Sequence, residues 1–234
     1  MKYSLDDVLR ALNVPAAESP PECVCGEPVQ YYRQSCPKCQ SAQKAADRRL
    51  LLGESIRSLA GFPWAVWGKD WANLSQPIIV ATMSRWTRAK GNVLLSGPSG
   101  CGKTSASVAR ARMILQKAEK GGTPEEFRFA CGIRFASALD LSTARKQHAL
   151  GHGEPPEIET ALDAELLILD ELGFESQADT VIPELADLRY RKGKITITTT
   201  GLRSGELVAR YGEATIRKLS NNNIVEGAFE KVGK

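Results

Sequence analysis

The sequence lacks any apolar run that approaches the roughly 20 residues that a helix needs to cross a lipid bilayer. Its first residues, 1–7, carry no apolar signal core either, so we expect a cytoplasmic protein without a membrane partner. Histidine is scarce: only His148 and His152 occur, and we expect both at the surface rather than as metal ligands. The net charge of +4 permits a nucleic-acid partner but is too small to indicate one.

A glycine-rich segment at residues 97–104 fits the pattern G-x-x-x-x-G-K-[ST], which is typical of loops that bind the phosphates of nucleoside triphosphates. An apolar run precedes the segment and an Ala-rich helical stretch follows it, as this loop requires. Glycines let successive amides point at one anion, and the helix adds the positive end of its dipole. A glycine-rich turn that only caps a helix is the alternative. We predict that ATP binds through Gly97, Pro98, Ser99, Gly100, Cys101, Gly102, Lys103 and Thr104.

A second informative segment is the continuous apolar run at residues 166–169, which leads into Asp170 and Glu171. Such a run is typical of a buried parallel strand whose carboxyl end reaches a site. With the phosphate loop it predicts ATP hydrolysis, in which Lys103 reaches the β- and γ-phosphates. Thr104 and Asp170 would bind Mg²⁺, and Glu171 would orient and deprotonate the attacking water. Taken alone, the two acids could simply belong to an acidic loop that follows a core strand.

Four of the six cysteines crowd into one short segment near the amino terminus: Cys23, Cys25, Cys36 and Cys39. Two pairs of thiolates suit a tetrahedral Zn²⁺ ion, which can fold a segment that has no core of its own. A phosphate-loop enzyme works in a reducing compartment, where clustered cysteines favour a metal over disulfides. We therefore predict a structural zinc site with no open coordination position; disulfides and unligated cysteines are the alternatives.

From Val93 onward, short apolar runs alternate with helical stretches, which predicts an α/β fold with a parallel sheet covered by helices on both faces. The expected strands are residues 92–96, 133–136, 166–169, 195–200 and 223–225. We expect residues 1–60 to form a zinc-binding, partner-docking module with a helical linker, and residues 61–234 to form the nucleotide domain. We expect no sizeable carboxy-terminal lid, because the sequence stops soon after the last strand.

These segments resemble the AAA+ ATPases of the DnaC/DnaI and IstB type, which comprise replicative helicase loaders and transposition helper proteins. The resemblance spans roughly residues 85–225 and rests on the phosphate loop and the acidic strand end. It also rests on three later segments, at residues 188–190, 198–202 and 210–212. A zinc module ahead of the ATPase core is similar to DnaI-type loaders, in which that region engages the hexameric helicase.

The resemblance implies a γ-phosphate sensor at Thr200, where the family commonly has asparagine. It also implies a finger residue that reaches the γ-phosphate of a neighbouring subunit, so the chain would form a homo-oligomer. The matching position holds Lys218, with Arg217 one residue earlier, and both stay open as the finger. Lysine lacks the planar fork of arginine, so we favour Arg217. A weak sensor and finger imply a slow, partner-stimulated ATPase.

The resemblance further implies a single-stranded DNA channel, lined here by residues 138–152 with Arg145 and Lys146; a solvent-facing helix is the alternative. The function that follows is an ATP-dependent loader that places a hexameric replicative helicase on single-stranded DNA. A transposition helper ATPase that assembles on duplex DNA is the nearest alternative, and an adaptor that binds ATP with little hydrolysis is another. A small-molecule kinase would need an Arg-rich lid that the sequence does not offer.

Overall fold

The computed structural model describes residues 22–29, 35–60, 76–148, 153–176 and 180–228. The chain divides into two compact units between Arg49 and Leu50. Of the helices in these ranges, none is both long and apolar enough to cross a membrane.

The helical linker expected within residues 1–60 is two helices, α2 (Pro37–Leu51) and α3 (Gly53–Ala60). Helix α3 belongs to the second unit, because Leu59 is fully buried in its core together with Leu52, which separates the two helices. The second unit thus begins at Leu50, ahead of the domain boundary that the sequence predicts at residue 60.

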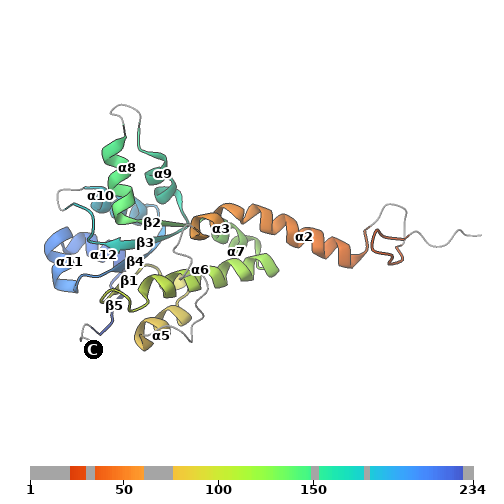
Figure 1. The fold of residues 1–234 in the computed structure, drawn as a ribbon, viewed down its shortest axis with the longest axis horizontal. Helices are drawn as coiled ribbons and strands as arrows, with labels where there is room; N and C mark the ends of the chain where they lie inside the picture. Colours follow the sequence, from red (N-terminus) through yellow and green to blue (C-terminus); the bar gives the residue numbers. More distant parts are fainter. Residues whose placement is uncertain (1–21, 30–34, 61–75, 149–152, 177–179, 229–234) are drawn as a thin grey trace, which may run out of the picture. The chain divides into compact units, whose positions relative to one another are not determined.

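The second unit is built on one five-stranded parallel sheet with the strand order β2-β3-β4-β1-β5 (Figure 1). The strands are β1 (Val93–Ser96), β2 (Ile133–Ser137), β3 (Leu166–Leu172), β4 (Ile195–Thr200) and β5 (Ile224–Glu226). The predicted α/β fold with a P-loop core is thus confirmed. Because β4 lies between β1 and β3, the carboxyl ends of these three strands are neighbours, and a ligand at that edge contacts all of them.

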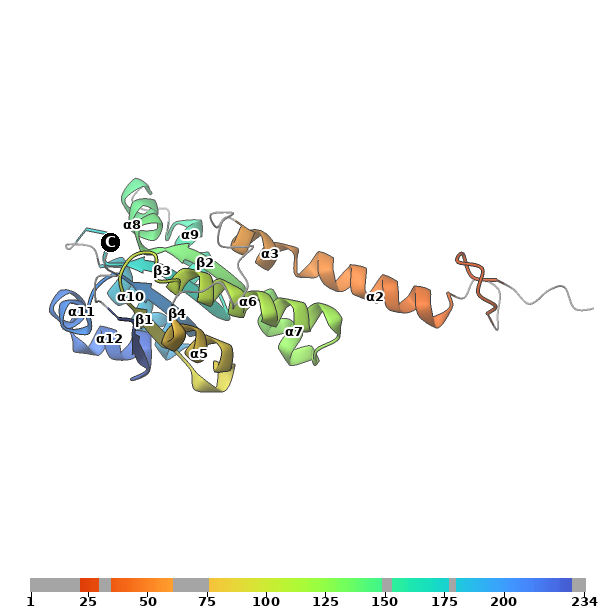
Figure 2. The same ribbon diagram turned by 60° about the horizontal axis from the view of Figure 1, so that its bottom comes forward.

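Helices cover both faces of this sheet (Figures 1 and 2). One face packs against α3, α5 (Pro77–Arg85), α6 (Lys103–Lys120) and α7 (Pro124–Cys131). The other packs against α8 (Ala138–Gln147), α9 (Pro156–Asp163), α10 (Val181–Arg191), α11 (Ser204–Tyr211) and α12 (Glu213–Ser220). A short 3₁₀ helix, η2 (Arg88–Lys90), precedes β1.

Successive side chains of the central strands enter two separate hydrophobic cores. Leu167 and Leu169 pack in the core with α8 to α12, whereas Ile168 packs with α6 and α7 on the opposite face. All three side chains are fully buried. This two-sided burial explains why β3 reads as a continuous apolar run rather than an alternating one.

Arg189 of α10 is a buried cation, 1% exposed, in the core beneath the sheet. Its Nη1 donates to the carbonyl oxygens of Ala161 (2.6 Å) and Ala164 (2.8 Å). Its Nε donates to Oγ1 of Thr196 (3.0 Å). Burial lowers the pKa of the guanidinium to about 10, because a charged group loses its hydration there. Arg189 therefore ties α10 to the end of α9 and the start of β4.

We expect Arg189→Leu to lower the free energy of unfolding by about 3–5 kcal/mol, because it leaves buried carbonyl oxygens without a donor. Arg191→Leu is the matched control on the same helix. Arg191 is 67% exposed and pairs with Asp187, so its loss should cost less than about 1 kcal/mol. Urea unfolding followed by tryptophan fluorescence measures both values; equal losses would contradict the role of Arg189.

Candidate active site

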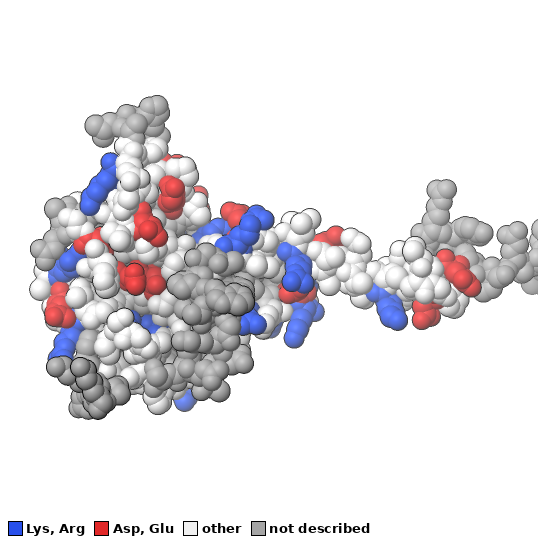
Figure 3. Space-filling model, in the orientation of Figure 1, with Lys and Arg blue, Asp and Glu red and all other residues white. Residues whose placement is uncertain are grey.

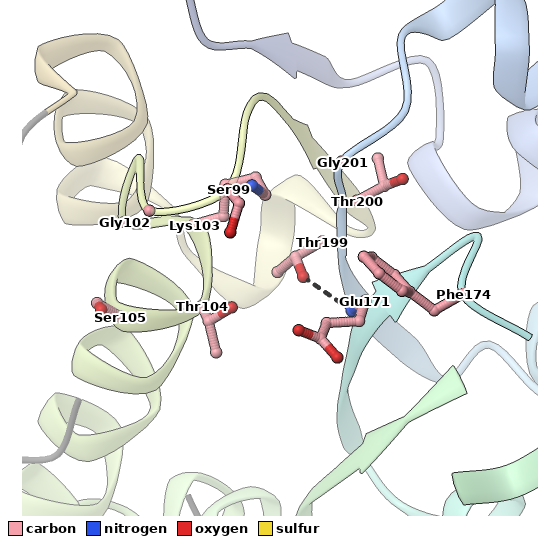
Figure 4. Close-up of a pocket in the computed structure, with 11 residues that line it drawn as sticks. Ser99, Gly102, Lys103, Thr104, Ser105, Glu171, Phe174, Thr199, Thr200 and Gly201 are labelled. Atoms are coloured by element: carbon pink, nitrogen blue, oxygen red, sulfur yellow. Dashed lines mark hydrogen bonds between the residues drawn. The ribbon is translucent and has the colours of Figure 1, made fainter. Parts of the chain in front are cut away.

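A cavity of about 260 Å³ opens at the carboxyl edge of the sheet, where the loop after β1 faces the ends of β3 and β4 (Figure 4). Ser99, Gly100, Gly102, Lys103 and Thr104 line it from the loop side. The other predicted loop residues, Gly97, Pro98 and Cys101, do not line the cavity, and Cys101 is buried. The predicted phosphate loop thus forms one wall of a pocket.

The loop has the backbone conformation of an anion cradle. Gly100 (φ 81°) and Gly102 (φ 92°) adopt left-handed conformations that side chains with a Cβ rarely tolerate. Gly102 is also the N-cap of α6 and offers no side chain to the amides of the first turn. Those amides are available to a phosphate, which the helix dipole also favours.

Lys103 holds its ammonium group inside this loop and is 9% exposed. Nζ donates to the carbonyl oxygens of Gly97 (2.7 Å) and Pro98 (2.9 Å) and lies 3.6 Å from Sγ of Cys101. The charge is therefore kept at the centre of the cradle, where it can pair with phosphate oxygens.

Asp170 joins the loop to two strands. This buried carboxylate, 7% exposed, accepts hydrogen bonds at Oδ1 from the hydroxyl groups of Thr104 (2.7 Å) and Thr199. Thr104 belongs to the first turn of α6, and Thr199 is the penultimate residue of β4. A carboxylate beside a hydroxyl is an oxygen donor set that suits Mg²⁺, so these residues fit the ion that accompanies ATP.

Glu171 points its carboxylate into the cavity from the end of β3 (Figure 4). Its backbone is left-handed (φ 56°), and its amide donates to Oγ1 of Thr199 (3.2 Å). A left-handed residue other than glycine costs about 1–3 kcal/mol and persists only where its surroundings hold it. The pairing register of β3 and β4 is broken between Leu169 and Leu172, which lets the chain turn here.

Thr200, the predicted sensor, also lines the cavity, but its hydroxyl group bonds to neither acid. Its Oγ1 donates to the carbonyl oxygen of Leu172 (2.7 Å) and accepts the amide of Leu202 (3.0 Å). Thr199, which the sequence did not single out, contacts both Asp170 and Glu171 instead. Three threonines in a row hide this difference, since neighbouring strand residues face opposite sides and the sequence does not reveal the register.

The two finger candidates lie on α12, outside the cavity of their own chain. Lys218 has a partner in its own chain, because its Nζ forms an ion pair with Oδ1 of Asp187 (2.6 Å). Arg217 is exposed. Of the two candidates, Arg217 is therefore the more exposed.

Helix α8 carries the residues expected to meet DNA. Arg145 already forms two ion pairs within the chain, with Glu184 and with Glu154 (2.8 Å for the latter). Lys146 is exposed, and His152 lies outside the described residues. On the face in Figure 3, basic and acidic side chains of the described part of the second unit are intermingled rather than gathered into a basic band.

The first unit contains a second site, made only of cysteines. The four Sγ atoms of Cys23, Cys25, Cys36 and Cys39 all lie within 4.8 Å of one another, and all four thiols are free. A tetrahedral metal with metal–sulfur bonds of about 2.3 Å would place its sulfurs roughly 3.8 Å apart. The Sγ atoms of Cys25 and Cys36 lie 3.4 Å apart. The group therefore fits a tetrahedral ion such as Zn²⁺.

Backbone amides contact two of these thiols. The amide of Cys36 donates to Sγ of Cys23 (3.3 Å), and that of Cys39 donates to Sγ of Cys36 (3.4 Å). The amides of Cys25 and Cys36 lower the pKa of Cys23, whereas hydrogen bonds with the other three thiols raise the pKa of Cys39. A thiolate is the form that binds a metal. Gly26 (φ 85°) lies in a tight turn, after which the carbonyl oxygen of Glu27 accepts the amide of Cys23.

Fold and site together define a P-loop nucleotide-binding protein with an AAA+ core. The model of the IstB-like ATP binding protein family matches residues 72–219, and the chain belongs to this family. The predicted resemblance to ATPases of the DnaC/DnaI and IstB type is thereby confirmed, and with it ATP binding. A comparison with curated protein sequences found no match.

Several solved structures are similar to this chain. DnaI is 17% identical over 71% of this chain and 95% of its own, with a TM-score of 0.51. The DnaC helicase loader is 25% identical over 64% of this chain and 86% of its own, with a TM-score of 0.46. DnaA from Aquifex aeolicus bound to AMPPCP is 17% identical over 65% of this chain and 45% of its own, with a TM-score of 0.47.

We expect Lys103→Ala to weaken ATP binding by about 100-fold, because it removes the cation at the centre of the loop. Lys117→Ala is the control: this lysine lies on the same helix, is 69% exposed and pairs with Glu126. Titration with a fluorescent ATP analogue measures both affinities. An unchanged affinity for Lys103→Ala would show that the loop does not bind phosphates as described.

Proposed function

We propose that this protein is a slow, partner-stimulated ATPase that hydrolyses ATP at interfaces between copies of the chain. One observation supports this best: Thr104, Asp170 and Thr199 meet at one carboxylate oxygen, directly beside Glu171. A site that only bound a nucleotide would not need a carboxylate placed to receive a proton from water.

In this proposal the loop amides and Lys103 hold the β- and γ-phosphates. Thr104 and Asp170 would bind Mg²⁺, which supplies positive charge to the phosphate oxygens when bound. Glu171 accepts a proton from a water molecule as the water oxygen attacks the γ-phosphorus. The bond from the γ-phosphorus to the bridging oxygen breaks, which releases ADP and phosphate. Thr199 positions both acids through its single hydroxyl group.

We assign the finger to Arg217 of a neighbouring copy. Lys218 is paired with Asp187, whereas Arg217 is exposed, which supports the choice of arginine. A guanidinium supplied from a second subunit can raise the hydrolysis rate by about 10³–10⁵-fold. ATP turnover would then depend on assembly, as expected for a switch.

We expect Glu171→Gln to lower ATP turnover by at least about 100-fold while nucleotide affinity stays near that of the wild type. Arg217→Ala should cause a similar loss, whereas Lys218→Ala should retain most turnover. Phosphate release at saturating ATP measures the rates. Equally inert wild type and Glu171→Gln proteins would favour a nucleotide-gated adaptor over an enzyme.

A mixture of two inactive proteins tests the interface. A Glu171→Gln copy keeps its finger but cannot activate water, and an Arg217→Ala copy has the opposite defect. If the finger acts between subunits, the mixture recovers turnover that neither protein shows alone. Failure to recover, with both proteins still binding ATP, would mean that Arg217 does not act on a neighbour.

We further propose that the partner is a hexameric replicative helicase, which the protein helps to place on single-stranded DNA. The four-cysteine unit ahead of the ATPase core supports this, because it resembles the module by which DnaI-type loaders engage a helicase. Exposed Val24, between two of the cysteines, offers an apolar contact to a partner.

A transposition helper remains the second candidate. The family model that matches this chain is that of IstB-like ATP binding proteins, and every residue of the proposed ATPase site would serve either role. The two functions differ in the protein that this chain binds, so identifying that partner distinguishes them.

We expect the purified full-length protein to carry about one zinc ion per chain, bound by four thiolates. Cys36→Ser should lose that zinc and the ability to retain the host's replicative helicase, because the docking unit loses its fold. Cys131→Ser, a half-buried cysteine outside the cluster, is the matched control. Metal analysis and a binding assay with purified helicase test this; binding to a transposase instead would establish the transposition helper.

A further inference from the structure

Glu175 is a buried carboxylate whose two oxygens serve two different parts of the second unit. Its side chain is 1% exposed, although it lies only a few residues after the acids of β3. Oε2 accepts the amide of Gly173 (3.0 Å). Oε1 accepts the hydroxyl of Tyr211 and lies 3.3 Å from Nη2 of Arg210. A carboxylate is expensive to bury, so its partners hold it firmly in one arrangement.

The first oxygen fixes the loop that carries Glu171. Within this loop, Glu171 (φ 56°) and Gly173 (φ 109°) are both left-handed, and the amide of Phe174 donates to the carbonyl oxygen of Glu171 (3.3 Å). A Cβ at Gly173 would come within 2.6 Å of Leu202, so the turn is also closely packed. The hydrogen bond from the Gly173 amide to the Glu175 carboxylate therefore joins two residues of the same turn and stabilises it.

The second oxygen fixes the junction between α11 and α12. Arg210 and Tyr211 are the last residues of α11, and Gly212 (φ 79°) separates them from α12, which carries Arg217. Nε of Arg210 also donates to the hydroxyl oxygen of Tyr211 (3.0 Å), and Arg210 reaches the carbonyl oxygen of Glu175. Burial, and then the Glu175 carboxylate, raise the pKa of Tyr211, so its hydroxyl stays a donor.

We propose that Glu175 is a positioning residue that couples the loop carrying Glu171 to the helix carrying Arg217. In one chain, it links the group that activates water to the group that reaches the neighbouring site. Movement of either element then acts on the other through one buried side chain. This inference rests on the proposed ATPase function, because it gives Glu171 and Arg217 their roles.

The direct test is Glu175→Gln, which keeps the size of the side chain and removes its charge. We expect kcat for ATP to fall about 10-fold or more while KM changes less than about 3-fold, because the loop is misplaced but the phosphate loop is intact. If Glu175 were only structural, the variant would lose stability and contain less active protein, but kcat per active site would not fall. Active sites are therefore counted by nucleotide binding.

Two further variants guard this test. Glu126→Gln is the matched control: this carboxylate also accepts a backbone amide, that of Thr123 (2.9 Å), and pairs with Lys117, but it lies on α7 outside the cavity. Its turnover should equal that of the wild type. Tyr211→Phe removes one hydroxyl from the cluster and should lower kcat about 3-fold, which keeps the proposal testable if Glu175→Gln does not fold.

Mixed subunits separate the two halves of the coupling. The reference mixture combines Glu171→Gln, which donates the finger, with Arg217→Ala, which supplies the working site. Adding Glu175→Gln to the finger donor should lower recovered turnover, even though every working site keeps its own Glu175. Adding it to the site supplier should also lower turnover, through the loop.

Unchanged turnover with Glu175→Gln in the finger donor would overturn the coupling to α12. Unchanged kcat for the single variant would overturn the proposal as a whole. A wild-type protein that does not hydrolyse ATP is a different result, since that outcome contradicts the proposed function itself.

Discussion

The rest of the site depends on the hydrogen bonds that the carboxylate of Asp170 accepts from Thr104 and Thr199. This carboxylate is buried near the carboxyl end of β3 and accepts hydrogen bonds from hydroxyl groups in the first turn of α6 and near the end of β4. An isolated carboxylate would be costly at this depth, so its partners must stay in place. One side chain therefore aligns the phosphate loop with two strands, and the cavity between them keeps a fixed shape.

Glu171 lies between two such anchors. Its predecessor Asp170 is held by hydroxyl groups, and Gly173 beyond it is held by the buried carboxylate of Glu175. A left-handed backbone at Glu171 is unfavourable by itself and persists because both sides of the residue are fixed. The same network reaches Arg210 and Tyr211 at the end of α11, so the loop that carries Glu171 is connected to the junction with α12, the helix of the proposed finger Arg217.

The two proposed metal sites follow opposite coordination chemistry. Hydroxyl and carboxylate oxygens around Asp170 suit a hard ion that stays partly hydrated, such as Mg²⁺. The four sulfurs of the first unit suit a softer ion with a closed tetrahedral shell. Membership in the IstB-like ATP binding protein family accounts for the first site, over residues 72–219, and the cysteine unit lies outside that match. The nucleotide site and the cysteine unit are thus separate parts of the chain.

The sequence alone determined the features that depend on neighbouring residues: the phosphate loop, the buried strand before Asp170, the α/β alternation and the cysteine cluster. These follow from local spacing and periodicity, which a single sequence displays. Only the tertiary structure decided that Thr199 rather than Thr200 contacts Asp170, that Lys218 is already paired, and that Glu175 is buried. Each of these depends on strand register or on a partner about 30 residues away, and charge and polarity look the same in sequence whether a side chain faces water or a buried partner.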